Sequence, residues 1–110
     1  MEDKTAKIEE KLCEMISTAG AARSTYIGAI QAAKSGEGNP AALMEEGNGY
    51  FQQAHEIHHE LLTMSSEEGS EGLPVTMFLV HVEDQLMCAE TFRILAEEFI
   101  DLYRKMEGKG

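Results

Sequence analysis

An apolar-rich run spans residues 75–103 and contains, near its start, Leu79-Val80-His81-Val82-Glu83-Asp84-Gln85-Leu86-Met87. The run holds neither proline nor glycine and few β-branched residues, which is typical of a helix. Its apolar side chains fall on two lines, whereas an ordinary surface helix has one stripe. The first line comprises Leu79, Val82, Leu86, Ala89, Ala96, Ile100 and Tyr103. The second comprises Phe78, Cys88, Phe92, Leu95, Phe99 and Leu102, and His81 and Gln85 fall on it. Two apolar lines need neighbours on two sides, which so small a chain hardly supplies, so the pattern indicates an oligomer.

Length and composition narrow the class of protein. The 110 residues suffice for one domain with a modest core, and a hydrophobic content of 43% is ordinary for a soluble globular protein. The formal net charge of -11 argues against nucleic acid and anionic membranes, and it suits a partner with a basic docking face. No run is long and apolar enough for membrane insertion, and residues 1–4 begin no signal peptide, so we expect a cytoplasmic protein. Cys13 and Cys88 are expected to be buried free thiols.

Helix start and stop signals predict three helices in a single domain over residues 1–110. Asn39 is a natural N-cap and Pro40 suits a first helical position, while Pro74 opens the third helix. Gly36 follows the end of the first. The predicted helices cover approximately residues 4–35, 40–66 and 74–106. Short connections between long helices predict an all-α fold, an antiparallel up-down-up bundle.

Several glycines lie inside these predicted helices. Asn48-Gly49 is a turn signal within the second helix, but the apolar stripe keeps its phase across it, which favours an unbroken helix. Gly20 and Gly28 in the first helix would let another helix approach closely.

The segment His55-Glu56-Ile57-His58-His59 matches H-E-x-x-H, a pattern that places two imidazoles on one helical face with a glutamate as base at a zinc ion. A metal-dependent hydrolase that uses His55, Glu56 and His59 is therefore one hypothesis. It requires a third protein ligand and a substrate cleft between lobes, and a three-helix chain offers no obvious second lobe. The alternative is a partly exposed flank whose histidines bind metal only adventitiously.

His81 and Asp84 are three residues apart and share a helix face. A histidine and an acid in apolar surroundings form a candidate site, although a histidine on an apolar helix is often only a core residue. Its ring can carry a phosphoryl group or coordinate a metal. The chain has no glycine-rich phosphate loop, so we expect no nucleotide cofactor, and a phosphoryl group would have to arrive from another protein.

Residues 79–87 resemble the signature of the lactose/cellobiose-type enzyme IIA of the bacterial phosphotransferase system, which reads apolar-apolar-His-small-Gln-Asp-His-Leu-Met. Three further segments resemble family motifs in the same order: Ala19-Gly20-Ala21-Ala22-Arg23-Ser24, Ala54-His55 and Leu95-Ala96-Glu97-Glu98-Phe99-Ile100-Asp101-Leu102-Tyr103. Each motif is weak alone, whereas four at the right separations are fairly specific.

The resemblance implies a three-helix chain that assembles as a homotrimer. It also implies a phosphohistidine carrier that accepts a phosphoryl group from HPr and passes it to a cysteine of enzyme IIB. The group then reaches a disaccharide such as lactose or cellobiose, which enters through membrane enzyme IIC. His81 corresponds to the phosphorylated residue, modified at Nε2, and Asp84 to the aspartate that faces the trimer axis. Three carboxylates meeting there repel one another unless they are protonated or bridged by a cation, and oxygen ligands suit a structural Mg²⁺.

Three positions depart from the family pattern. Gln85 stands where the family usually has a second histidine; it can donate a hydrogen bond but cannot be charged, and it is our candidate helper. Glu83 replaces the usual Gln and adds a negative charge that should disfavour the phosphorylated state, and Val82 replaces a small residue. These departures keep open a second class of function, a non-catalytic regulatory or scaffold trimer.

Overall fold

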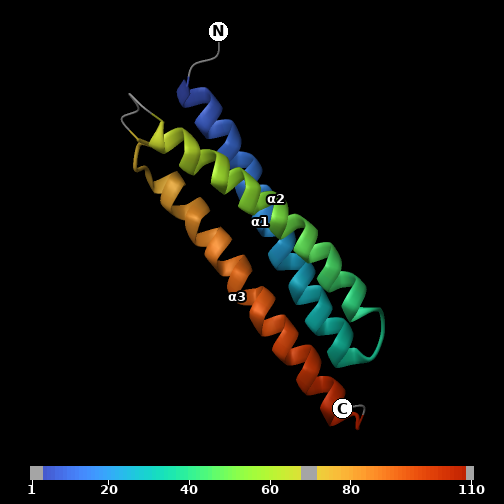
Figure 1. The fold of residues 1–110 in the computed structure, drawn as a ribbon. Helices are drawn as coiled ribbons and strands as arrows, with labels where there is room; N and C mark the ends of the chain where they lie inside the picture. The colour runs from blue at the N-terminus through green and yellow to red at the C-terminus, as the bar shows by residue number, and fades with distance from the viewer. Residues whose placement is uncertain (1–3, 68–71, 109–110) are drawn as a thin grey trace.

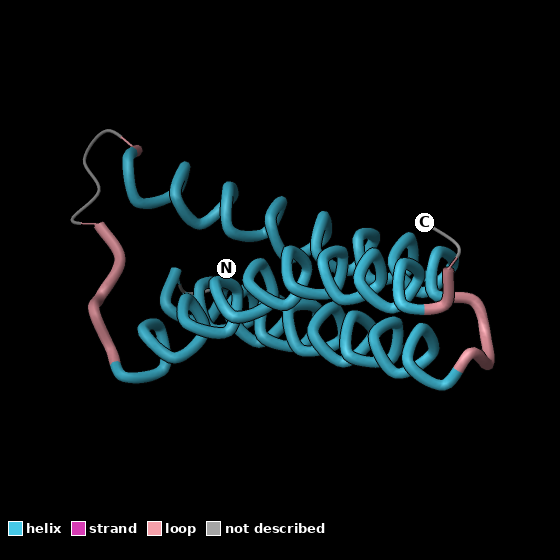
Figure 2. Tube along the Cα trace, turned by 90° about the horizontal axis from the view of Figure 1, so that it is seen from below, coloured by secondary structure: helices cyan, strands magenta, loops and turns pink. Residues whose placement is uncertain are grey.

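The computed structural model describes residues 4–67 and 72–108 and shows three long helices (Figure 1). They are α1 (Lys4–Ser35), α2 (Pro40–Ser66) and α3 (Met77–Met106). Successive helices run in opposite directions, with their connections at opposite ends of an elongated bundle (Figure 2). The predicted all-helical fold is confirmed, and no strand occurs within the described ranges.

Local side-chain chemistry fixes where α2 and α3 begin. The Oδ1 atom of Asn39 accepts a hydrogen bond from the backbone N–H of Ala42 at 3.1 Å, and Pro40 follows as the first helical residue. The third helix begins at Met77, later than the predicted residue 74. Its cap is Thr76, whose Oγ1 accepts from the N–H of Leu79 at 3.0 Å, so Pro74 belongs to the segment before the helix.

The turn between α1 and α2 depends on two glycines. Gly36 and Gly38 have φ angles of 77° and 91°, in the left-handed region that glycine adopts without strain. The N–H of Gly36 donates to the carbonyl of Ala32 at 3.0 Å and so closes the last turn of α1.

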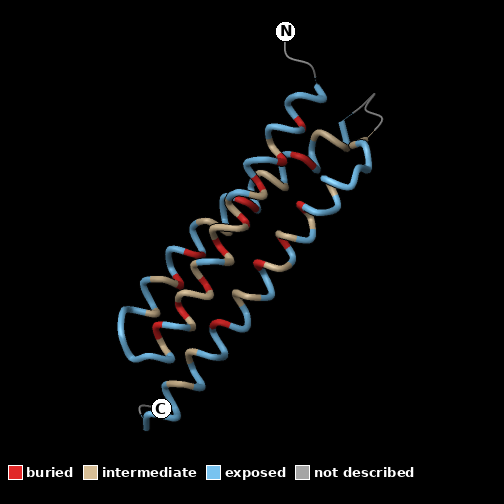
Figure 3. Tube along the Cα trace, turned by 180° about the vertical axis from the view of Figure 1, so that it is seen from behind, coloured by how far each residue is buried: buried red, intermediate tan, exposed pale blue. Residues whose placement is uncertain are grey.

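The core lies along α1, which packs against both other helices, while α2 and α3 contact each other much less. Buried residues lie on the faces of the helices that point into the bundle, and exposed residues lie on the faces that point outward (Figure 3). Two clusters divide the core along the bundle axis. The first contains Ile8, Leu12, Met15, Ala19, Ala54, Leu61, Val82 and Leu86. The second contains Ala22, Tyr26, Ala29, Met44, Ala89 and Ala96.

Tyr26 packs closely against α2 at Gly47 and Asn48. The ring is fully buried, and its hydroxyl donates to Oδ1 of Asn48 at 2.7 Å. A Cβ added at Gly47 would lie 2.7 Å from Cε1 of Tyr26, so only glycine leaves room for the ring. In contrast, a Cβ at Gly20, Gly28 or Gly49 would meet no atom within 4 Å. The expected close approach at Gly20 and Gly28 is therefore not made among residues 4–67 and 72–108.

Candidate functional site

The two apolar lines of α3 have different environments. Residues of the first line are buried against the bundle, among them Val82, Leu86, Ala89 and Ala96. The second line is largely exposed: Leu95 retains 42% of its accessible surface, Phe99 39% and Leu102 49%. Exposed apolar residues extend over much of α3: Met77, Phe78, Val80, Met87, Ile94, Leu95, Phe99, Leu102 and Met106. So much uncovered apolar surface on one small chain is typical of an interaction face.

His81 belongs to this exposed side of α3, in the second turn of the helix after the Thr76 cap. Its side chain is exposed, as is that of Asp84, and Gln85 is half-buried. Within residues 4–67 and 72–108, the side chain of His81 forms no hydrogen bond or ion pair. An accessible imidazole without an internal partner is suited to reaction with another molecule.

Glu83 lies away from His81, which corrects the expectation that its charge stands beside the phosphorylation site. Residues two apart on a helix project about 200° apart, since each residue turns the helix by about 100°. The Glu83 carboxylate instead contacts Nε2 of His58 on α2 at 3.0 Å, with both side chains partly buried. Sequence reasoning missed this pair because it joins residues 25 positions apart on different helices.

The H-E-x-x-H residues lie on the outer side of α2. His55, Glu56 and His59 are all exposed, and together with Glu60 they line an open depression. Within the part of the chain that the structure describes, no group of three His, Cys, Asp or Glu side chains is arranged to hold a metal ion. The hydrolase hypothesis therefore lacks the third protein ligand that it requires.

A groove runs between α1 and the start of α3, one turn before His81. It has a volume of about 400 Å³, and its lining is mostly apolar. Its lining residues are Thr5, Ile8, Glu9, Leu12, Cys13, Pro74, Thr76 and Phe78.

Cys13 is exposed and Cys88 half-buried, and both are free thiols. The prediction of buried thiols is therefore wrong for Cys13, which faces outward on α1.

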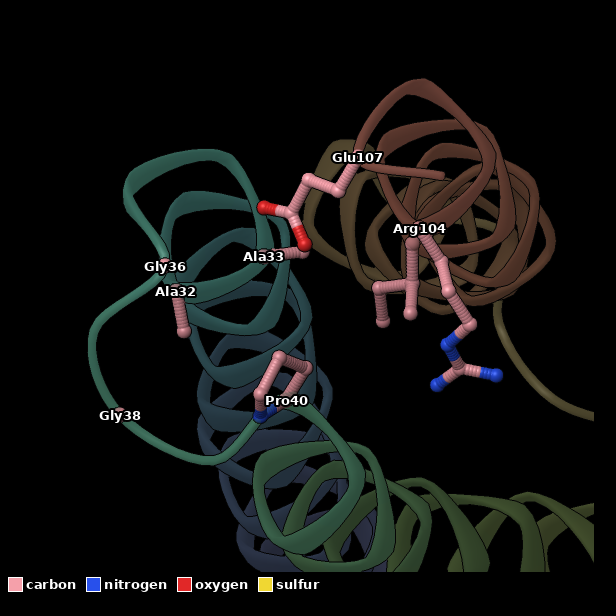
Figure 4. Close-up of a pocket in the computed structure, with 8 residues that line it drawn as sticks. Ala32, Ala33, Gly36, Gly38, Pro40, Arg104 and Glu107 are labelled. Atoms are coloured by element: carbon pink, nitrogen blue, oxygen red, sulfur yellow. The ribbon is translucent and has the colours of Figure 1, made fainter. Parts of the chain in front are cut away.

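A second pocket of about 250 Å³ lies at the opposite end of the bundle, between the α1–α2 turn and the end of α3. In Figure 4 the Glu107 carboxylate points toward Ala33, while the guanidinium of Arg104 points away from it. Neither His81 nor Asp84 contributes to this pocket.

No helix in the described ranges is long and apolar enough to cross a membrane.

Comparisons with known proteins agree on one family. The family model described as "PTS system, Lactose/Cellobiose specific IIA subunit" matches residues 10–104. The lichenan-specific phosphotransferase enzyme IIA component of Bacillus subtilis is 34% identical over 101 residues, which cover 91% of this chain and 90% of that protein.

Solved structures give the same result. The crystal structure of the cellobiose-specific enzyme IIA from Bacillus anthracis has a TM-score of 0.87 and 33% identity, covering 100% of this chain and 97% of that one. The IIA(chitobiose) chain in the solution structure of its complex with HPr, from Escherichia coli, has a TM-score of 0.75 and 29% identity. That match covers 97% of this chain and 99% of the other.

Proposed function

Since the chain belongs to the lactose/cellobiose-specific IIA family of the phosphotransferase system, we propose that it carries a phosphoryl group on His81. The observation that carries this proposal is the position of His81, which is exposed and unpaired within the described chain. The donor protein and the acceptor protein must each contact the carrier histidine in turn. An exposed imidazole near the start of α3 is accessible to both.

Transfer to and from His81 requires positioning more than acid–base chemistry. The phosphoryl group moves between two nucleophiles roughly in line, and the surroundings contribute by orienting it and stabilising its charge. Gln85 lies one turn after His81 and can donate a hydrogen bond from its amide to a phosphoryl oxygen. Glu83 does not oppose the added charge closely, because its carboxylate is directed to His58.

The proposed donor is HPr and the proposed acceptor is a cysteine of enzyme IIB. A relative of this chain, IIA(chitobiose), forms a complex with HPr, which supports the donor. The net charge of -11 suits a donor with a basic docking face. The reaction would serve uptake of a disaccharide such as lactose or cellobiose through enzyme IIC, and it would take place in the cytoplasm.

We further propose that the chain works as a homotrimer through the exposed apolar residues of α3, with His81 at the rim of the interface, where donor and acceptor still reach its ring. Burial of this face in an oligomer removes apolar surface from water, and each Å² of apolar surface that is buried stabilises the oligomer by about 25 cal/mol. Asp84 is exposed on the same side of the helix and would face its two symmetry mates at the axis. Three carboxylates there suit Mg²⁺, a cation that prefers oxygen ligands, and the ion would neutralise their mutual repulsion.

The experiment is intact-mass spectrometry after incubation with phosphoenolpyruvate, enzyme I and HPr. We expect one acid-labile phosphoryl group on the wild-type chain and none on His81→Ala. His58→Gln is the matched control, because it removes a histidine of α2 and leaves His81 in place. A wild-type oligomer that stays unmodified would refute the carrier and favour the regulatory or scaffold trimer. Modification of the His81→Ala variant would refute the assignment of the residue.

A further inference from the structure

We propose that His55 and His59 form a binding site for one divalent transition-metal ion on the outer side of α2. The two residues are four positions apart in a continuous helix, and both are exposed. Side chains at this spacing have Cβ atoms about 5–6 Å apart, which allows two imidazoles to reach one ion with bonds of about 2.0–2.1 Å. The proposal is independent of phosphoryl transfer at His81.

Both imidazoles are available as ligands. Within the described residues, neither ring forms a hydrogen bond or an ion pair. The ring of His55 lies near that of Phe51, with centroids 6.2 Å apart and planes tilted by 35°, and this contact does not use a ring nitrogen. His58, on the same helix, is different because its Nε2 atom contacts Glu83 on α3. Of the three histidines of α2, His55 and His59 are therefore available as metal ligands, whereas His58 is already paired with Glu83.

The acidic neighbours of this pair have other partners. Glu56 accepts a hydrogen bond from the amide of Gln52 at 3.4 Å, and Glu60 is paired with Lys11 of α1. Their carboxylates line the same depression as the two imidazoles and give it a negative charge that attracts cations. The direct protein ligands are then the two imidazoles alone, in agreement with the absence of a three-residue metal cluster in the described part of the chain.

This donor set defines the class of metal. Imidazole nitrogens suit Zn²⁺, Ni²⁺ and Cu²⁺, whereas Mg²⁺ and Ca²⁺ prefer oxygen ligands. With two protein ligands, the remaining coordination positions are left to water or to a group from another molecule. The site is therefore open and exchangeable, unlike the closed four-ligand arrangement of a structural zinc site.

Isothermal titration calorimetry with Zn²⁺, and in parallel with Mg²⁺, tests the proposal. We expect one Zn²⁺ per chain for the wild type and an affinity at least about tenfold lower for His55→Gln and for His59→Gln, because loss of even an outer partner of a metal ligand weakens binding by about 10–100-fold. Both positions are exposed and glutamine is a good helix former, so these variants should fold. His58→Gln is the matched control and should bind Zn²⁺ as the wild type does.

A thermal unfolding series provides a second readout. Because the ion binds the folded helix, Zn²⁺ should raise the Tm of the wild type and of His58→Gln, and it should not raise that of His55→Gln. Equal Zn²⁺ affinity in all four proteins would overturn the proposal. Mg²⁺ heats that fall in His55→Gln and His59→Gln as the Zn²⁺ heats do would also overturn it, since they would assign binding to the acidic depression and not to the imidazole nitrogens. Mg²⁺ held at Asp84 would be unaffected by either substitution.

Discussion

Replacing Gly47 with alanine should destabilise the bundle, although alanine is the better helix former. The added methyl would lie 2.7 Å from Cε1 and 2.9 Å from Cδ1 of Tyr26. The ring cannot move away cheaply, since it is fully buried and its hydroxyl is held by Asn48. Overpacking of this kind costs about 1–3 kcal/mol, and the higher helix propensity of alanine offsets about 1 kcal/mol. The net expected loss is up to about 2 kcal/mol of the free energy of unfolding, and the loss relative to an unobstructed glycine-to-alanine change is about 1–3 kcal/mol.

The matched control is Gly49→Ala, two residues further along the same helix. A Cβ there would meet no atom within 4 Å, so this variant should gain up to about 1 kcal/mol from helix propensity alone. Urea unfolding followed by circular dichroism measures both changes, at one protein concentration because association would couple to folding. If Gly47→Ala proved as stable as Gly49→Ala, the inferred clash with Tyr26 would be wrong.

Three further outcomes are expected. Thr76→Ala should lower the free energy of unfolding by about 1 kcal/mol through loss of the α3 cap, with Thr76→Ser restoring most of it in the same urea assay. Burial raises the pKa of Tyr26, so ultraviolet titration should show one of the three tyrosines ionising later than the others. The stability linked to this shift is present below the unfolded-state pKa of about 10 and is lost as pH rises through the higher folded value. Phe99→Glu places a charge on the exposed face of α3 and should abolish the proposed trimer in light scattering, whereas Glu98→Gln should leave it intact.

Helix positions were predictable because their signals are local. Asn39 and Pro40 mark the start of α2 by side-chain and ring geometry that depends only on adjacent residues. The start of α3 was misplaced because Pro74 gives a strong local signal, whereas the capping hydroxyl of Thr76 gives a weaker one. Asn48-Gly49 resembles a turn, yet α2 continues through it, because packing against α1 outweighs local propensity.

The sequence singles out His81 by its motif, and the structure places its side chain on the exposed side of α3. What the sequence could not supply was the rotation of one helix relative to the next. That rotation decides that Glu83 meets His58 and that Cys13 faces outward. It also decides that, among the described residues, a neighbouring side chain packs against Gly47 and not against Gly20 or Gly28.

The position of α1 between two helices has a consequence for which substitutions the fold can accept. Its buried face after residue 19 is mostly alanine, with Ala22 and Ala29 fully buried, because helices on two sides leave little room. Enlargement at these positions would push away α2 or α3, so α1 should be intolerant of added volume. Val82 and Leu86 of α3 are large residues that fill the space beside α1, and there the damaging change is a reduction in volume. A saturation library selected for folding should therefore be restricted by a maximum side-chain size at Ala22 and Ala29 and by a minimum size at Val82 and Leu86.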